Sequence, residues 1–200
     1  MNTKDWILEK TLELILDKCT IDISINDIRN ATGLTTGGIY YYYSDKNEII
    51  DGILQKYVID YIKIDFDKII LKGSSKDKIH DTLFYFLHHF INGVKIESIN
   101  EEINYRDVLL LLTPIAFSND EYYSAITQIG ENIEIFLTDL VEDGKMQNEI
   151  RKDFSTKNIV ESFYILYLGV QNYWISFTTD DINLIFEKNF ELTWQAIKSQ

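Results

Sequence analysis

The chain begins with two apolar stripes that recur at helical spacing. Between residues 6 and 18, apolar side chains return every three to four positions, which predicts an amphipathic helix with one buried face. Ser24 and Asp27 stand three residues apart, as in a capping box, and an apolar stripe follows them. This spacing predicts a second, short helix over 25–32.

A third helix is predicted over 36–42, after a tight turn. Gly33 stands where a helix commonly ends in the left-handed conformation, and the Thr35 hydroxyl can cap the next helix start. Gly37 and Gly38 each cost such a helix roughly 1 kcal/mol relative to alanine. We therefore expect something to approach the backbone closely at these two glycines.

Helical spacing continues through the rest of the chain. Asp45 and Glu48 form a further capping pair, and they begin a long helix that we expect to end only at the Lys72-Gly73-Ser74-Ser75 segment. Further helices are predicted over 75–93, 101–112, 119–143, 156–177 and 181–198. No segment has the pattern of a strand, so the expected fold class is all-α.

Composition and charge narrow the function classes. The 200 residues include one proline and one cysteine, so Cys19 can form neither an internal disulfide nor a thiolate metal site. The formal net charge of -13 opposes approach to nucleic acid at long range. Nucleic acid repels the first 50 residues less, because they hold five basic and eight acidic side chains.

The sequence shows no membrane-spanning or secretory segment. The longest apolar run, 108–117, is shorter than the ~20 residues that span a bilayer, and the start of the chain lacks the layout of a secretory signal. We expect a cytoplasmic protein without a membrane partner.

Three motifs within the first quarter of the chain carry a family resemblance. Residues 24–28 (SINDI), 31–35 (ATGLT) and 37–46 (GGIYYYYSDK) resemble the helix-turn-helix of the tetracycline-repressor (TetR/AcrR) family of bacterial transcription regulators. The resemblance implies a three-helix DNA-binding head over 1–47, joined by a long helix to a helical domain over 48–200. That second domain is implied to bind an unidentified small-molecule effector and to form a homodimer. The implied function is a ligand-released repressor acting on a palindromic operator in double-stranded DNA.

The resemblance also assigns roles within the head. Tyr40, Tyr42 and Lys46 match the phosphate-contacting positions of the family, and Lys46 would form an anion site with free N–H groups at the start of the next helix. Small residues at the start of the third helix would let it sit deep in the major groove. Tyr43 is expected in the core. The candidate DNA-binding residues are Thr35, Thr36, Gly37, Gly38, Tyr40, Tyr41, Tyr42 and Lys46.

Three positions depart from the pattern of the family. Arg29 stands where the family usually has a small residue, and it either adds a phosphate contact or is simply solvated. Gly38 stands where the family commonly has a hydroxyl side chain, and Cys19 stands where glycine often ends the first helix. The polar candidates for reading bases are Thr35, Thr36, Tyr41 and Arg29. With so few of them, we expect modest direct readout and some dependence on DNA shape.

The remainder of the chain is rich in aromatic residues, which suit an apolar pocket between helices and equally suit plain core packing. The candidate pocket residues are Tyr85, His88, Tyr105, Phe117, Tyr123, Phe163, Tyr167 and Trp174. His80, His88 and His89 have no carboxylate three or four residues after them, so neither a metal site nor a cofactor is expected.

The last two predicted helices each carry an apolar stripe that requires burial. The residues are Ile159, Phe163, Leu166, Tyr167, Val170 and Trp174 on the first and Ile182, Ile185, Phe186, Phe190, Trp194 and Ile197 on the second. By the resemblance, a partner copy would supply that burial through a four-helix bundle.

Two other function classes remain to be weighed. A nucleophile elbow, a P-loop, an HExxH motif and a CxxC pair are all missing from the sequence, so we do not expect an enzyme. A helical protein-interaction adaptor that has lost sequence-specific DNA binding is the alternative, and both the acidic charge and Gly38 favour it.

Overall fold

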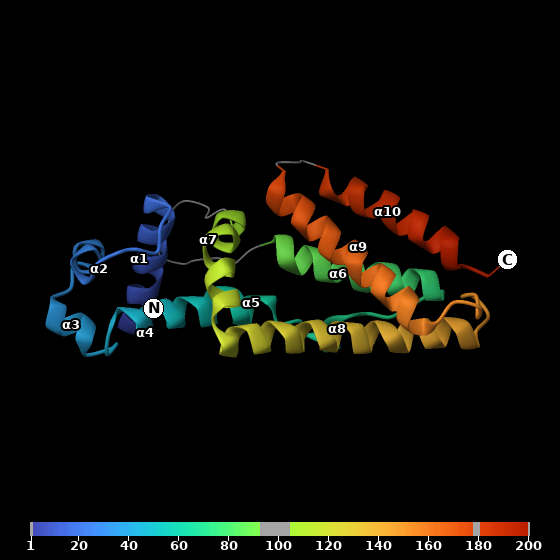
Figure 1. Cartoon of the computed structure of the whole chain (residues 1–200), viewed down its shortest axis with the longest axis horizontal. Coiled ribbons are helices and arrows are strands. Elements are labelled where there is room, and N and C mark those ends of the chain that lie inside the picture. The colour runs from blue at the N-terminus through green and yellow to red at the C-terminus, as the bar shows by residue number, and fades with distance from the viewer. Residues whose placement is uncertain (1, 93–104, 178–180, 200) are drawn as a thin grey trace. The chain divides into compact units, whose positions relative to one another are not determined.

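The computed structural model describes residues 2–92, 105–177 and 181–199, and within them the regular structure is helical (Figure 1). The elements are α1 (Thr3–Lys18), α2 (Ile25–Thr32), α3 (Thr36–Tyr40), α4 (Lys46–Leu54), a π-helical turn (Gln55–Ile59), α5 (Asp60–Ile62), a 3-10 turn (Phe66–Lys68), α6 (Ser75–Ile91), α7 (Tyr105–Ser118), α8 (Asp120–Met146), α9 (Thr156–Ser176) and α10 (Ile182–Ile197). The predicted all-α fold class is confirmed.

The chain divides into two compact units. Among the described residues, the first unit comprises 2–62 and 105–125, and the second comprises 63–92, 126–177 and 181–199. This division follows packing alone. The boundary at residue 47 separates two expected functions and stays a prediction.

The predicted caps of the first helices form. Ser24 and Asp27 make a reciprocal capping box at the start of α2: the Asp27 N–H donates to Ser24 Oγ, and the Ser24 N–H donates to Asp27 Oδ2 at 2.8 Å. Gly33 ends α2 with a φ of 72°, in the left-handed region that glycine adopts without strain. Cys19 ends α1 with a φ of 49°, which a side chain bearing a Cβ adopts at a cost.

The helix that begins at Lys46 is shorter than predicted. It passes through the π-helical turn and ends at Ile62, ten residues before the Lys72-Gly73-Ser74-Ser75 segment. Ile64, Phe66 and Ile69 are partly buried against the core of the second unit, whereas Lys63 and Asp65 are exposed. These side chains come from a segment that has left the α-helix and forms the 3-10 turn at Phe66–Lys68, and its burial on an apolar surface outweighs continued α-helix formation.

Helix α7 continues through Pro114, although the prediction ended it at residue 112. The predicted start at residue 101 lies outside the described residues, because 101–104 are not described. Proline removes the hydrogen bond to the carbonyl four residues earlier, at Leu110. Both Pro114 and Leu110 are exposed, so water can satisfy that carbonyl and the helix tolerates the proline.

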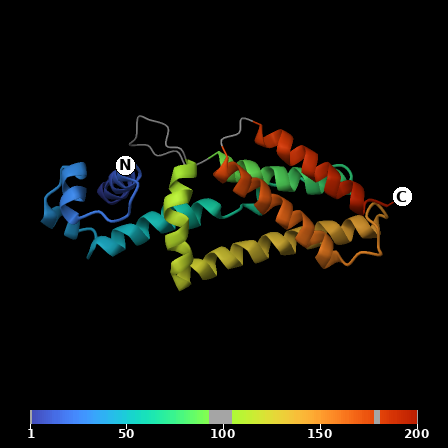
Figure 2. The same cartoon turned by 45° about the horizontal axis from the view of Figure 1, so that its top comes forward.

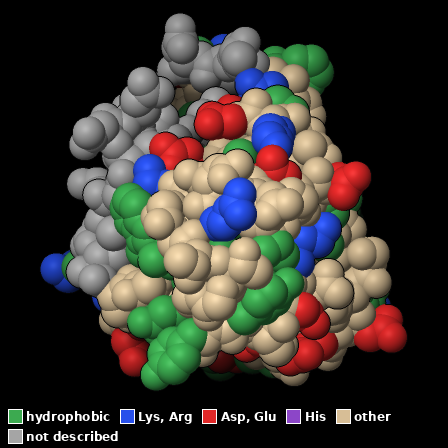
Figure 3. Space-filling model, turned by 90° about the vertical axis from the view of Figure 1, so that its left-hand side faces the viewer, with side chains coloured by type: hydrophobic (Ala, Val, Ile, Leu, Met, Phe, Trp, Pro, Cys, Tyr) green, Lys and Arg blue, Asp and Glu red, His purple; other side chains and the backbone are tan. Residues whose placement is uncertain are grey.

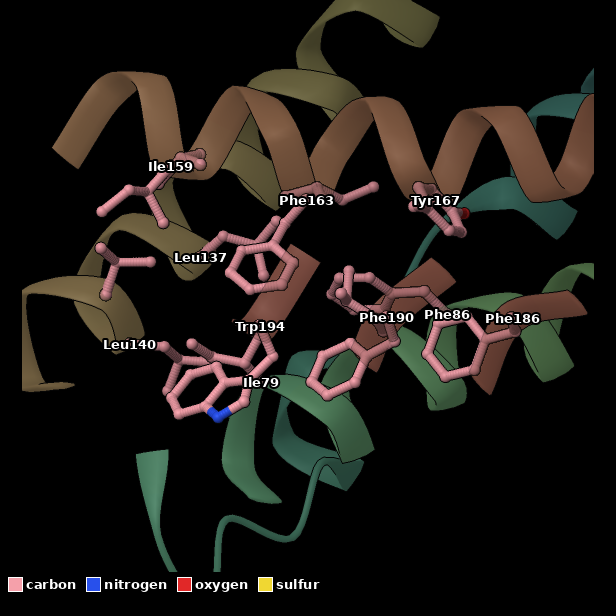
Figure 4. Packing of buried hydrophobic residues seen from close by; sticks show 14 of the residues in the cluster. Ile79, Phe86, Leu137, Leu140, Ile159, Phe163, Tyr167, Phe186, Phe190 and Trp194 are labelled. Carbon is pink, nitrogen blue, oxygen red and sulfur yellow. The ribbon is translucent and has the colours of Figure 1, made fainter. Parts of the chain in front are cut away.

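The core of the second unit consists of aromatic and aliphatic side chains from α6, α8, α9 and α10. Figure 4 shows Phe163 of α9 and Phe190 of α10 facing Phe86 of α6 and Leu137 of α8. The Phe163 and Phe190 rings stack with centroids 5.8 Å apart. Helices α9 and α10 lie side by side in both views (Figures 1 and 2).

This packing corrects the prediction about the two apolar stripes. Phe163, Tyr167, Phe186 and Trp194 are buried within the second unit, so the stripes do not need a partner copy. Their burial is internal because α9 and α10 turn these residues toward α6 and α8. The residues left exposed on α9 and α10 are others, namely Ile165, Leu168, Tyr173, Leu184 and Leu192. No helix in the described segments combines the length and apolarity needed to cross a bilayer.

The left-handed backbone at Cys19 generates a stability prediction. Cys19→Gly should raise the free energy of unfolding by about 0.5–1 kcal/mol, because glycine relieves the positive φ but gains conformational entropy in the unfolded chain. Cys19→Ala is the control, since it removes the thiol and keeps the strain. Denaturant unfolding followed by circular dichroism measures both, and equal stability of the two variants would contradict the prediction.

Candidate nucleic-acid interface

Helix α3 owes its position to the residues around it. Thr35 caps its start, with the Thr35 Oγ1 accepting from the Gly38 N–H at 3.0 Å. Ile39 and Tyr43 are buried in the first unit, and the Tyr43 hydroxyl donates to the Lys4 carbonyl at 3.1 Å. The prediction that Tyr43 belongs to the core is confirmed. Its burial, together with the nearby Asp5 and Glu48 carboxylates, raises the pKa of the phenol.

Burying Ile39 and Tyr43 leaves the other tyrosines facing solvent. Tyr40 is 47% exposed and Tyr41 is 82% exposed. Tyr42 is partly buried, and its ring meets that of Tyr41 edge-on at 5.0 Å. The tyrosine run therefore presents phenols at the end of α3, the residue type expected there for contacts to phosphate.

The two glycines of α3 have different surroundings. A Cβ at Gly37 would meet no atom within 4 Å, whereas a Cβ at Gly38 would lie 3.2 Å from Thr35 Oγ1. Packing within the chain thus explains the small residue at Gly38, where a larger one would press on the cap. It does not explain Gly37, which borders open space.

The start of α4 is more acidic than the predicted anion site requires. The capping pair forms, and its carboxylates take one N–H of the first turn and one that precedes the helix: Asp45 accepts from Glu48, and Glu48 accepts from Ser44. The Ser44 backbone N–H holds the pKa of Glu48 below its ordinary value. The N–H groups of Ser44 and Glu48 are therefore not free for a phosphate, and Lys46 is the cationic group at this helix start.

A cleft of about 530 Å³ lies between the end of α2 and the start of α3. It is lined by Arg29, Asn30, Gly33, Leu34, Thr35 and Thr36. Asn30 is a residue that the sequence analysis missed, although it follows Arg29 on the side of α2 opposite the buried Ile28. That polar pair on the solvent face was the available signal.

The electrostatics of this surface are mixed. Lys18 donates to Asp27 Oδ1 at 2.7 Å, and this contact, with the hydrogen bonds from Ser24, holds the pKa of Asp27 well below its usual range. Figure 3 views the molecule from the side on which α2 and α3 lie in Figure 1. The middle of this face is mostly uncharged around one basic side chain, and acidic side chains lie above it beside basic ones and toward the lower and right edges (Figure 3).

The structure distributes the predicted pocket residues over both units. Tyr105, Phe117 and Tyr123 belong to the first unit, where the Tyr105 hydroxyl donates to the Tyr57 carbonyl at 3.0 Å and the other two are exposed. The remaining residues, Tyr85, His88, Phe163, Tyr167 and Trp174, belong to the second unit. Within that unit, Phe163 and Tyr167 are part of the packed core.

The histidines have structural partners. His80 bridges α6 and α10, with its ring nitrogens 3.0 Å from Asp81 Oδ1 and 2.9 Å from Glu187 Oε1. His88 Nε2 lies 3.1 Å from Asn183 Oδ1. Across the residues that the structure describes, no three His, Cys, Asp or Glu side chains gather as metal ligands would.

Comparison with known proteins assigns the fold. No protein-family model matches the chain. A transcriptional regulator from Saccharomonospora viridis in complex with choline superimposes with a TM-score of 0.67 at 13% identity, covering 99% of this chain and 98% of that one. A TetR-family regulatory protein from Rhodococcus RHA1 superimposes with a TM-score of 0.66 at 15% identity, covering 100% of this chain and 99% of that one. AibR in complex with isovaleryl coenzyme A and operator DNA superimposes with a TM-score of 0.60 at 17% identity, covering 96% of this chain and 97% of that one. The chain therefore has the fold of these regulators along nearly its whole length.

The open space beside Gly37 generates a second stability prediction. Gly37→Ala should raise the free energy of unfolding by roughly 0.5–1 kcal/mol, because alanine favours the helix and its Cβ meets no neighbour. Gly38→Ala, which presses on the Thr35 cap, is the matched control and should gain less or lose stability. Thermal unfolding of the two variants measures the difference, and a destabilised Gly37→Ala would show that the fold itself requires this glycine.

Proposed function

We propose that the chain is a DNA-binding transcriptional regulator whose first unit carries the DNA-binding surface. The observation that carries the proposal is the α2–α3 pair, in which a short helix is capped by Thr35 and exposes Tyr40 and Tyr41 while Ile39 anchors it. The same fold in AibR is seen with operator DNA. Residues 1–47 are the proposed DNA-binding part and 48–200 the proposed effector-binding and dimerisation part.

The proposed contacts follow from position on α3. Thr36, Gly37 and then Gly38 form the start of α3, which is the end of a recognition helix that meets base edges. Tyr40 and Tyr42 lie at its end, and their phenolic O–H groups can donate to phosphate oxygens on the groove wall. Lys46 supplies the charge at the start of the next helix. Thr35 acts chiefly as the cap, and Tyr41 extends into solvent beside Tyr42.

The acidic charge of the protein shapes this binding. A net charge of -13 repels DNA at separations up to the screening length, so affinity has to come from short-range contacts of the head. Phosphate contacts by Lys46 release counterions and make the affinity fall as salt rises. We expect weaker non-specific binding than a basic protein of this size would show.

The proposed regulator acts as a homodimer through the exposed faces of α9 and α10. A groove of about 400 Å³ runs between these helices, lined by Ser162, Ile165, Leu166, Gly169, Val170, Tyr173, Ile185, Asn189 and Thr193. Ile165 is 68% exposed, and a Cβ at Gly169 would meet no atom within 4 Å. Small residues beside exposed apolar ones allow a second pair of helices to approach closely. A twofold dimer would present two heads to a palindromic operator.

A small-molecule effector is proposed to release the DNA. The regulator from Saccharomonospora viridis holds choline, and AibR holds isovaleryl coenzyme A. For this chain we propose an effector that binds among the aromatic residues of the helical body and lowers DNA affinity through a coupling of typically ~1–3 kcal/mol. Tyr85, His88 and Trp174, which are partly buried, are the proposed contacts in the second unit.

Loss of a phosphate contact tests the DNA-binding surface. Lys46→Ala should weaken binding to every DNA sequence and reduce the slope of log affinity against log salt by about one per subunit, because one fewer counterion is released. Lys72→Ala removes the same charge from the exposed segment before α6, outside the proposed DNA-binding and dimer surfaces, and should leave the slope unchanged. Fluorescence anisotropy with DNA from upstream of the gene, between low and moderate salt, measures both slopes. Absence of binding by the unmodified protein would favour the adaptor alternative.

A charge placed on the α9–α10 face tests the dimer. The unmodified protein should sediment as a dimer at micromolar concentration, and Leu192→Glu should convert it to a monomer, since the 70% exposed leucine would lie in the interface. Ile70→Glu is the control, because Ile70 is 68% exposed but lies outside that face. Sedimentation velocity distinguishes the species. A monomeric unmodified protein, or a dimer insensitive to Leu192→Glu, would contradict this interface.

A further inference from the structure

Helix α3 has few side chains with which to read bases. It contains five residues, and two of them, Gly37 and Gly38, have no side chain that could reach a base edge. The Thr35 hydroxyl already accepts from the Gly38 N–H. In a helix-turn-helix, the N-terminal end of the recognition helix faces the floor of the major groove. Thr36 is therefore the polar side chain that remains at this end of α3.

The cleft beside this helix start contains a stronger hydrogen-bonding group. Arg29 is exposed, and it lines the cleft together with Thr35 and Thr36. Its Nη2 donates to Asn30 Oδ1 at 3.3 Å, and within the described part of the chain it forms no ion pair. Arg29 thus keeps most of its five donors available, and the neighbouring Asn30 amide orients the guanidinium.

The chemistry of arginine selects one base. The planar fork of a guanidinium matches the O6 and N7 acceptors that guanine presents in the major groove, and this bidentate pair is a specific contact. A side chain at the start of a recognition helix lies near base edges, whereas Tyr40, Tyr42 and Lys46 lie at the end of α3 and beyond, nearer the proposed phosphate positions.

We propose that Arg29, oriented by Asn30, reads a guanine in the major groove and supplies most of the sequence preference of the head. This inference rests on the proposed DNA-binding function. It assigns to the end of α2 the selectivity that the glycine-rich start of α3 does not provide. Close approach at Gly37, whose Cβ would face open space, brings the cleft onto the base edges.

The experiment compares sites selected from a randomised duplex pool by the unmodified protein and by Arg29→Ala. The unmodified protein should select a G·C pair at one fixed position of each half-site. Arg29→Ala should lose that preference, with discrimination against an A·T pair there falling about tenfold. Arg29→Lys, which keeps the charge but not the fork, should also lose the preference while retaining its affinity for unrelated DNA.

Two controls identify the cause of any change. Lys10→Ala removes a charge from α1, where Lys10 pairs with Glu13, and should leave the selected sequence intact. Circular dichroism and thermal unfolding of each variant establish that the protein keeps its helical fold and its stability. A loss confined to one base position, with the rest of the selected site preserved, is the expected result.

Other outcomes overturn the inference and separate it from the proposed function. Weaker binding of Arg29→Ala to all sequences, with a smaller salt slope and an unchanged selected site, would make Arg29 a phosphate contact. An unchanged selected site at unchanged affinity would remove Arg29 from the interface and leave the DNA-binding function standing. Failure of the unmodified protein to bind any duplex would overturn both proposals.

Discussion

Everything proposed for the head depends on the anchoring of α3 by buried side chains. A five-residue helix with two glycines is not stable by itself, because helix nucleation is costly and glycine raises that cost. Ile39 and Tyr43, four residues apart, bury one side of the segment, and the Tyr43 hydroxyl ties it to the Lys4 carbonyl of α1. Tyr40 and Tyr41 are exposed as a consequence.

The acidic composition is compatible with the candidate DNA interface because repulsion and hydrogen bonding act over different distances. Repulsion from a net charge of -13 acts over a screening length, whereas phenolic and guanidinium hydrogen bonds act only on contact. Asp27 and Glu48 also serve the fold, since each carboxylate accepts a backbone N–H at a helix start and is stabilised in its charged form there. Part of the negative charge of the head is therefore engaged in holding the starts of α2 and α4.

In the second unit, the apolar pattern of α9 and α10 predicts that their stripes are buried but does not predict which helices cover them. Phe163 and Phe190 stack inside the unit, so their stripes are satisfied by α6 and α8. The surface available to a second copy consists of Ile165 and Leu192 on the opposite faces, mixed with small polar residues. A helix that is apolar on two sides can have one side in the core and another at an interface.

Local features of this protein were determined by its sequence. The capping box at Ser24, the left-handed Gly33 and the burial of Tyr43 each depend on residues within a few positions or on one helical stripe, so spacing alone predicts them. The all-α fold followed from the same periodicity. The capping box holds because its hydrogen bonds join residues three apart and need no distant partner, whereas the burial of Tyr43 also uses α1, where its hydroxyl reaches the Lys4 carbonyl.

Tertiary structure decided what depends on distant neighbours. The helix beginning at Lys46 stops at Ile62 because the segment that follows covers the core of the second unit, and α7 accepts Pro114 because that face is exposed. The Arg29 cleft exists because the turn at Gly33 places the end of α2 beside Thr36. The periodicity of apolar residues predicts which side chains are buried, but only the packed fold specifies which surface covers them. The free energy of burial depends on the apolar area removed from water and not on where the covering residues lie in the sequence.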